Sequence, residues 1–320
     1  MTHSFKPNVD SSFARLTRLL LFFIACSVAA ASSQADVDTQ SIVVDVEGIP
    51  QDFAFDDSGS WVFVQSLRKN GDDETSLVTR IRLTARGSET VDATLPFHVL
   101  GHQGISIEHR TNGPVWLWGS KGGKDGGREA IRFMYKPNQS ISDVESYTLF
   151  DQRFMSKNVT MPKVCYGNQT LVVRGRTAPR EQYIRIFNLE QLKRGGPGDY
   201  SNQFVAEWPL PEALLSDGNP VQGIACDDKY VYILAGRSEI DQPKKIYVMT
   251  LNGQVVRKNI NVTIGRNIAL FDGKGKFYEP EGISVRQLPR SDQTSAYIGV
   301  LSGTGDRKTF RLWNFPDFTH

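Results

Sequence analysis

The sequence is poor in cysteine. Only three cysteines occur among 320 residues, and Cys26 lies in a segment that we expect to be removed. The two that remain, Cys165 and Cys226, do not make a disulfide framework. The chain must therefore be held together mainly by a hydrophobic core.

An excess of charge of either sign is also missing. The chain has 37 basic and 35 acidic residues. Residues 1–35 contain three of the basic residues and one of the acidic residues, so the rest of the chain has 34 of each. A nucleic-acid-binding protein normally shows a basic excess or a basic stripe. We therefore expect no nucleic-acid partner.

Long apolar runs are absent beyond the first 35 residues. Two arginines precede the apolar run 19–31, which is shorter than the roughly 20 residues that span a bilayer. Small residues in 33–35 make a cleavage signal. We predict a signal peptide over residues 1–35 and a single secreted domain over 36–320, without stable membrane insertion.

Two further patterns concern export. Phe23-Ile24-Ala25-Cys26 is close to a lipid-attachment box, so a lipoprotein is the alternative to simple secretion. Four triplets fit the N-glycosylation pattern and predict a glycoprotein if the host is a eukaryote. Their asparagines are Asn138, Asn158, Asn168 and Asn261.

What the sequence does contain is internal repetition. A polar or small residue leads into a short alternating apolar strand five times, and successive copies are separated by 52 to 60 residues. Near-constant spacing of this length indicates radial or solenoidal repetition. The copies are Gln51–Phe55, Gln103–Ile107, Pro162–Tyr166, Gln222–Cys226 and Glu281–Val285.

Each copy is followed by further strands in a fixed order. A turn and a second apolar strand come next, and a third strand then alternates Arg or Tyr with aliphatic residues, as expected where one face is buried. The third strands are Arg80–Leu83, Ile131–Phe133, Ile184–Phe187, Ile246–Met249 and Phe310–Trp313. Fourth strands are predicted at Thr90–Leu95, Ser146–Phe150, Phe204–Trp208 and Gln254–Val256.

The fifth module stops after its third strand, and the N-terminal strand Ile42–Val46 supplies the missing one. We therefore predict an all-β, five-bladed β-propeller with four-stranded blades, closed into a ring by this strand. A β-sandwich with coincidental spacing is the alternative. Short helices are expected at Asn188–Lys193 and Pro211–Leu215. The Gly-rich stretches 119–127 and 195–198 lack the context of a phosphate-binding loop, and we predict no cofactor.

The innermost strands of a propeller line a central channel, so the residues that open them should form a polar ring. Amides, an imidazole, an ammonium and carboxylates together donate and accept hydrogen bonds, which suits a polyhydroxylated or phosphorylated ligand. The alternative is that these groups bind channel water and one another. The candidate ligand-binding residues are Gln51, Asp52, His102, Gln103, Lys163, Gln222, Glu279 and Glu281.

Other chemistry is less well supported. Glycoside hydrolysis needs two carboxyls about 5 to 9.5 Å apart, and Asp52 and Glu281 are the candidates, with Glu108 as a weaker third. The alternative is that such carboxylates pair with Lys163 or channel amides. His98 and His102 have no third ligand nearby in the sequence, and we predict no metal site. The five tryptophans could stack on sugars, but their apolar neighbours favour packing between blades.

Three motifs and a closing strand resemble a known propeller. They are Gly101-His102-Gln103-Gly104-Ile105, Val221–Ala225, Glu279–Ile283 and Phe310–Phe315. Together they are similar to the propeller of certain phage receptor-binding proteins, teichoic acid biosynthesis protein C and helveticin J-type bacteriocins, over roughly residues 45–315. This resemblance implies recognition of cell-surface glycopolymers. In the third module, Pro162-Lys163 replaces the Gln-Gly lead.

Three functional hypotheses follow. The first is a secreted protein that binds a cell-surface or cell-wall carbohydrate or phosphoglycan polymer through the channel. The second is a glycosidase or related hydrolase that uses Asp52 and Glu281. The third is a bacteriocin-like toxin. Whether Cys165 and Cys226 are bonded stays open, because equivalent positions on adjacent blades need not lie within disulfide reach.

Overall fold

A computed structural model describes residues 41–71, 73–108, 113–123, 126–157, 160–167, 170–271, 277–288, 293–304 and 307–315. Residues Gln40–His320 form one compact unit. The predicted signal peptide, and two of the four possible glycosylation sites, Asn158 and Asn168, lie outside the described residues. Asn138 and Asn261 are both exposed.

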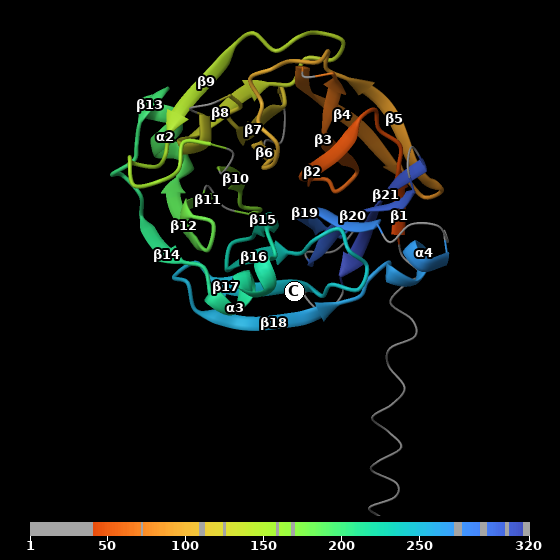
Figure 1. Ribbon diagram of the computed structural model, residues 1–320. Helices are drawn as coiled ribbons and strands as arrows, with labels where there is room; N and C mark the ends of the chain where they lie inside the picture. The colour runs from red at the N-terminus through yellow and green to blue at the C-terminus, as the bar shows by residue number, and fades with distance from the viewer. Residues whose placement is uncertain are drawn as a thin grey trace, which may run out of the picture. The chain divides into compact units, whose positions relative to one another are not determined.

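The described strands form five sheets arranged around a central axis, which confirms the predicted propeller (Figure 1). The first blade contains β2 (Ile49–Phe55), β3 (Trp61–Asn70), β4 (Asp73–Thr84) and β5 (Gly87–Ala93), and the second contains β6 (Ser106–Glu108), β7 (Trp116–Ser120), β8 (Glu129–Met134) and β9 (Val144–Thr148). The third contains β10 (Met161–Val164), β11 (Thr170–Ala178), β12 (Glu181–Asn188) and β14 (Ala206–Pro209). The fourth contains β15 (Val221–Cys226), β16 (Tyr230–Ala235), β17 (Lys244–Thr250) and β18 (Val255–Val262).

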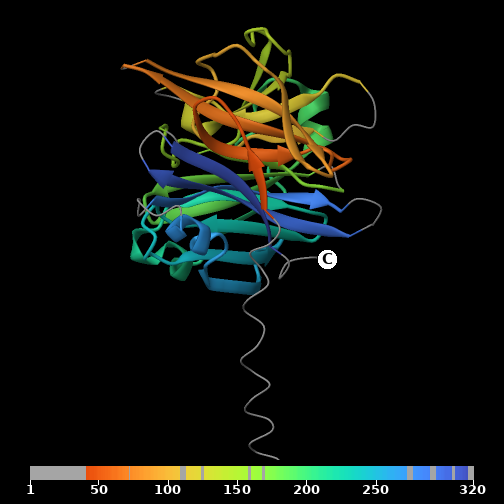
Figure 2. The same ribbon diagram turned by 90° about the vertical axis from the view of Figure 1, so that its right-hand side faces the viewer.

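The fifth blade is completed by the N-terminal strand, as predicted. Its sheet order is β1 (Ser41–Val44), β21 (Arg307–Phe315), β20 (Thr294–Thr304) and β19 (Phe277–Gln287). β1 pairs antiparallel with β21, and Figures 1 and 2 show it at the outer edge of this blade. Because residues from the two ends of the propeller share one sheet, the ring closes without leaving β21 as an open edge.

Some elements were not predicted. β13 (Gly198–Asp199) adds a fifth strand to the second blade, parallel to β9, and covers an edge that would otherwise be open. The helix α4 (Arg266–Phe271) was also missed, as were the short 3-10 turns Gly126–Arg128 and Ser216–Gly218. The two predicted helices are present as α2 (Leu189–Gly195) and α3 (Glu212–Leu215).

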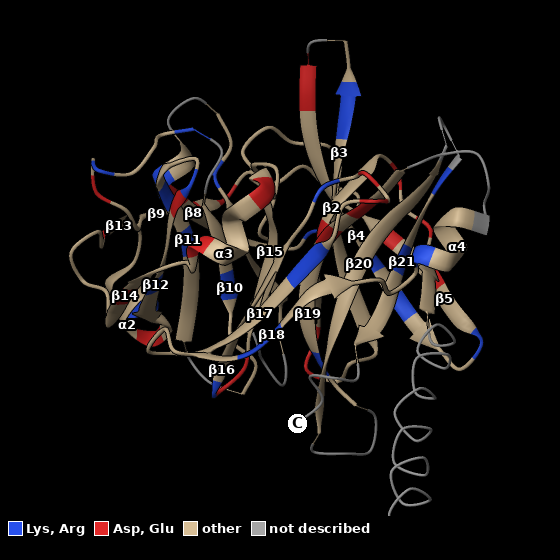
Figure 3. Ribbon diagram, turned by 60° about the horizontal axis from the view of Figure 1, so that its bottom comes forward, with Lys and Arg blue, Asp and Glu red and all other residues tan. Residues whose placement is uncertain are grey.

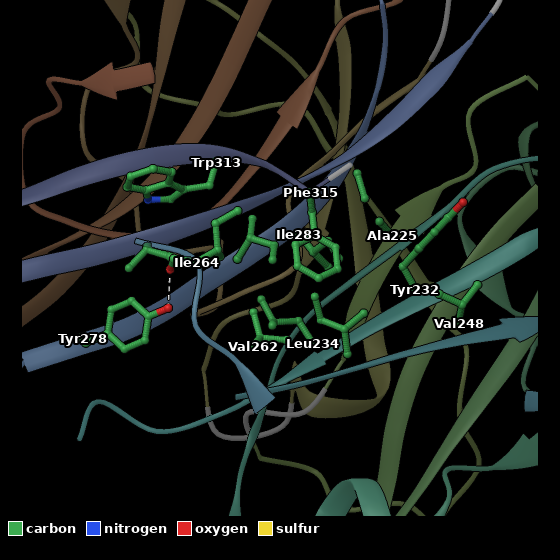
Figure 4. Packing of buried hydrophobic residues seen from close by; sticks show 14 of the residues in the cluster. Ala225, Tyr232, Leu234, Val248, Val262, Ile264, Tyr278, Ile283, Trp313 and Phe315 are labelled. Carbon is green, nitrogen blue, oxygen red and sulfur yellow. Dashed lines mark hydrogen bonds between the residues drawn. The ribbon is translucent and has the colours of Figure 1, made fainter. Parts of the chain in front are cut away.

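The hydrophobic core lies between neighbouring blades. One cluster joins the fourth and fifth blades through residues such as Leu234, Ile283 and Trp313 (Figure 4). In the same cluster the Tyr278 hydroxyl donates a hydrogen bond to the Ile264 carbonyl, so the buried phenol is satisfied. Trp118 is also fully buried, in the cluster between the second and third blades. Packing between blades is therefore the role of these tryptophans.

A disulfide joins the inner strands of the third and fourth blades. Cys165 and Cys226 are bonded, with their Cα atoms 4.6 Å apart. The question that the sequence left open is thus answered by a cross-link between adjacent repeats, from the fourth residue of one copy to the fifth residue of the next. The bond ties together blades whose inner strands also share the core.

Candidate functional site at the mouth of the central channel

The polar residues that open the inner strands are placed by irregularities in the strands. The pairing register shifts between Pro50 and Asp52 in β2, between Val221 and Gly223 in β15, and between Pro280 and Ile283 in β19. Such bulges leave an extra residue unpaired and turn its side chain away from the regular alternation. Gln51, Gln222 and Glu281 fall within these shifts.

Three glycines, Gly104, Gly223 and Gly282, allow the inner strands to approach closely. A Cβ on Gly104 would lie 2.8 Å from the Met161 Cα, and one on Gly223 would lie 2.8 Å from the Gly282 Cα. Both distances are shorter than real Cβ atoms show, so a side chain cannot be accommodated. Gly is therefore needed in these repeats because each inner strand packs against the backbone of the next blade.

The two repeats without glycine at this position carry opposite charges that meet. The Lys163 Nζ lies 2.8 Å from the Asp52 Oδ2, and both side chains are almost completely buried. Asp52 also accepts hydrogen bonds from the amides of Phe53 and Gly104, at 2.8 and 3.0 Å. Lys163 donates to the Phe53 and Ile105 carbonyls. One ion pair thus connects the first three blades.

Burial works against both charges of this pair. It raises the pKa of Asp52 and lowers the pKa of Lys163, while their mutual attraction and the hydrogen bonds to Asp52 oppose these shifts. A cavity of about 20 Å³ beside Lys163 is lined by residues that include Ala54, Ser106 and Ser284. It has room for about one water molecule. Asp52 and Lys163 therefore cross-link the inner strands of the first three blades.

At the start of the inner strands, four side chains form a hydrogen-bonded set that we call the mouth network: Gln103, Gln222, Glu279 and Glu281. The Gln103 Nε2 donates to the Gln222 Oε1 at 2.7 Å, and the Gln222 Nε2 donates to the Glu279 Oε1 at 3.2 Å. Gln103 also hydrogen-bonds the Glu281 carboxyl. The network links the second, fourth and fifth blades.

The two carboxyls of the mouth network are not ion-paired with any described residue. Glu281 is 3% exposed, and burial raises its pKa well above the usual value, with smaller contributions from Glu279 and Asp52. Burial also raises the pKa of Glu279, which is only partly covered. The positive charge of Lys308 lowers the pKa of both carboxyls and so opposes these shifts. The mouth network therefore contains one fully buried carboxyl whose pKa is raised by burial and by neighbouring carboxylates.

The remaining predicted residues lie apart from the network. Gln51 donates only to the adjacent Pro50 carbonyl. His102 turns toward the β3–β4 hairpin, where its Nε2 lies 2.5 Å from the Glu74 Oε1. This hairpin projects beyond the other strands and carries charges of both signs near its tip (Figure 3). Sequence reasoning missed Glu74 and Lys308, which belong to hairpins with no repeated motif.

Other candidates are occupied by structural contacts. The Glu108 carboxylate is buried and accepts from the Arg132 Nε at 2.6 Å. His98 lies 3.6 Å from Asp73. Among the described residues, no group of three or more His, Cys, Asp or Glu is placed to hold a metal ion.

The raised pKa of Glu281 gives a stability prediction. Because the native protein keeps a proton that the unfolded chain releases, this group stabilises fully below the unfolded pKa of about 4.3, and its contribution is lost as the pH rises through the native pKa. Glu281→Gln should therefore raise the free energy of unfolding near pH 8, with no gain near about pH 4. Urea unfolding across this range measures the effect. The exposed Glu212→Gln is the control, and an equal response of the two variants would contradict the assignment.

The comparisons with known proteins agree with this architecture. Residues 49–314 match the family described as the phage 5-bladed beta propeller receptor binding platform domain. The match covers most of the chain, and the protein belongs to this family. A comparison with curated protein sequences finds no match.

Among solved structures, the tail fiber of Staphylococcus aureus phage P68 is similar over 92% of this chain, with 17% identity and a TM-score of 0.62. The chain spans 56% of that protein's length, and the likeness concerns the fold. A xylan beta-1,4-xylosidase from Bacillus halodurans is 10% identical over 85% of this chain and 54% of its own, with a TM-score of 0.46. None of the helices in the described residues has the length and apolar character needed to span a bilayer.

Proposed function

We propose that this protein binds a cell-surface receptor through the mouth of its central channel, and that the receptor is a carbohydrate or phosphoglycan polymer of the cell surface or cell wall. Membership of the receptor-binding propeller family supports the first part. The observation that carries the second part is the mouth network, in which two amides and two carboxyls from three blades converge.

The chemistry of the network fits a polyhydroxylated ligand. Amide side chains both donate and accept hydrogen bonds. A carboxyl accepts them when ionised and can also donate when protonated, so the network can bind hydroxyl groups in several orientations. Gln103 and Glu279 are only partly buried, which leaves them open to a ligand from outside. The deeper Asp52–Lys163 pair is already satisfied and would support the site from below.

Export belongs to the same proposal. A signal peptide over residues 1–35 would deliver the propeller to the outside, where such polymers occur. A teichoic acid is one phosphoglycan of this class, and a helveticin-like killing activity would require the same surface recognition. Purified protein applied to a wide panel of strains would test the toxin hypothesis, and no killing would end it.

A hydrolytic role has one observation in its favour, the raised pKa of the Glu281 carboxyl, since a general acid needs a raised pKa. Asp52 is less suited to be its partner, because its carboxylate is committed to Lys163 and two backbone amides. Product analysis of each bound ligand separates the two roles. If Asp52→Asn leaves any hydrolysis intact, Asp52 is not the second catalytic carboxyl.

The binding proposal predicts the effect of removing the two amides. Gln103→Ala with Gln222→Ala should weaken binding to the recognised polymer about tenfold or more, because hydrogen bonds to charged or polar ligand groups are lost with no replacement. Binding to an array of glycans and cell-wall polymers measures this. The control carries Gln139→Ala and Gln254→Ala at two exposed positions. Unchanged binding in the first variant would remove the channel mouth from consideration.

A further inference from the structure

A second polar cavity lies beside the channel, between the second and third blades. It measures about 30 Å³, and its walls include Gly101, Gln103, Ser120, Thr160 and Arg174. This volume admits a few oxygen atoms but no sugar ring. Its residues come from the Gly101-His102-Gln103 loop, the end of β7, the start of β10 and the middle of β11.

Ser120 presents a hydroxyl with nothing to bond. Its side chain is 5% exposed, and the Oγ has no hydrogen-bond partner among the described residues. Gly101 leaves room for this hydroxyl, since a Cβ there would lie 2.7 Å from the Oγ. A buried polar group without a hydrogen-bond partner costs free energy, so the Ser120 hydroxyl indicates that a bound partner is missing from this cavity.

Two arginines stand on one face of β11, the first at this cavity and the second close to the first. Arg174 lines it, is 5% exposed, and donates through its Nε to the neutral Gln182 side chain at 2.8 Å. Arg176 follows two residues later, and its buried Nε has no hydrogen-bond partner among the described residues. Burial, and then the charge of Arg176, lower the pKa of Arg174 to about 9.

The missing partner must therefore be an acceptor. A guanidinium nitrogen can only donate, and a serine hydroxyl can donate as well. Two neighbouring positive charges favour an anionic acceptor over water, because charge-assisted hydrogen bonds are the stronger kind. Lys121, a further cation of the cavity wall, is already paired with Glu129 at 2.6 Å.

We propose that this cavity is a binding site for an oxyanion, a phosphate or carboxylate group, whose oxygens are bound by Ser120 and Arg174 and whose charge is balanced by Arg176. The site is distinct from the mouth network and does not depend on it. Gln103 borders both, so a polymer with an acidic group next to a sugar could occupy the two together.

The test titrates the full chain with inorganic phosphate, and separately with acetate, at constant ionic strength, and measures binding by calorimetry and by thermal unfolding. We expect saturable binding that raises the melting temperature. Phosphate binding alone identifies a phosphate site, and acetate binding alone identifies a carboxylate site. If neither anion binds, or if both raise the melting temperature no more than chloride does, the proposal is wrong.

Variants locate the binding. Ser120→Ala should weaken anion binding about tenfold without lowering the stability of the anion-free protein, since the buried hydroxyl has no partner to lose and its removal relieves an unsatisfied group. Arg176→Gln should weaken binding as well, and Arg180→Gln, which removes an exposed charge from the same hairpin, should not. Gln222→Ala should keep anion binding, which separates this site from the mouth network. Wild-type affinity in both Ser120→Ala and Arg176→Gln would overturn the assignment.

Discussion

Replacing Lys163 by Met should destabilise the propeller by about 3–5 kcal/mol, because it leaves the Asp52 carboxylate buried without its counter-charge. The two side chains are 4% and 1% exposed, so bulk solvent does not reach the carboxylate. The variant also loses the hydrogen bonds from Lys163 to the first and second blades. Urea unfolding at neutral pH measures the loss.

Two further variants show whether the loss comes from the unpaired charge. Lys163→Met combined with Asp52→Asn should be markedly more stable than Lys163→Met alone, since the uncompensated charge is gone. Lys136→Met breaks an ion pair of the same kind with Asp143, which is 78% exposed, and should cost no more than about 1 kcal/mol. Equal losses for Lys136→Met and Lys163→Met would contradict the account.

Removing the disulfide should have the next largest effect on stability. Replacing Cys165 and Cys226 by Ala should cost about 2–4 kcal/mol, since the bond closes a chain segment of 61 residues and limits the freedom of the unfolded chain. Chemical unfolding of the wild type with and without reductant should show a loss of the same size.

The double variant supplies the control for this measurement. Reductant should not change its stability, because Cys26 is the only cysteine that remains. Peptide mapping of the unreduced wild type should recover Cys165 and Cys226 in one cross-linked fragment. Two free thiols at these positions in the folded, unreduced protein would contradict the structure.

The architecture could be predicted from the sequence because its signal is repeated. Each inner strand carries a polar lead and alternating apolar residues at near-constant spacing, so five weak local patterns reinforce one another. The N-terminal strand was predicted correctly for the same reason, since one repeat lacked a fourth strand. β13 has no counterpart in the other blades and only two residues, and repetition could not reveal it.

The site was predictable only in part. Gln103 and Gln222 were expected to face one channel, and they do hydrogen-bond each other although they are 119 residues apart. The direction of His102 could not be predicted, because a loop has no fixed side-chain alternation. Arg174 belongs to no repeated motif, and only the packing of the folded chain shows that it is buried and lines a cavity.

The departure of the third repeat from the pattern has a physical reason. Lys163 stands where three other repeats have glycine, and it is the counter-charge of Asp52, the first repeat's own exception. Either Asp52 or Lys163 without the other would be a buried charge with no counter-charge, which is unfavourable. The two residues that depart from the fivefold pattern are thus explained by one ion pair, and the spacing of the repeats does not reveal this contact.

The most direct test of the account is a crystal structure of the protein with a fragment of the polymer that it selects from an array of glycans and cell-wall polymers. We predict that the fragment lies at the channel mouth, with its hydroxyl groups bonded to Gln103, Gln222 and Glu279. A fragment bound to the outer surface of the blades, with the mouth network unchanged, would contradict the central claim.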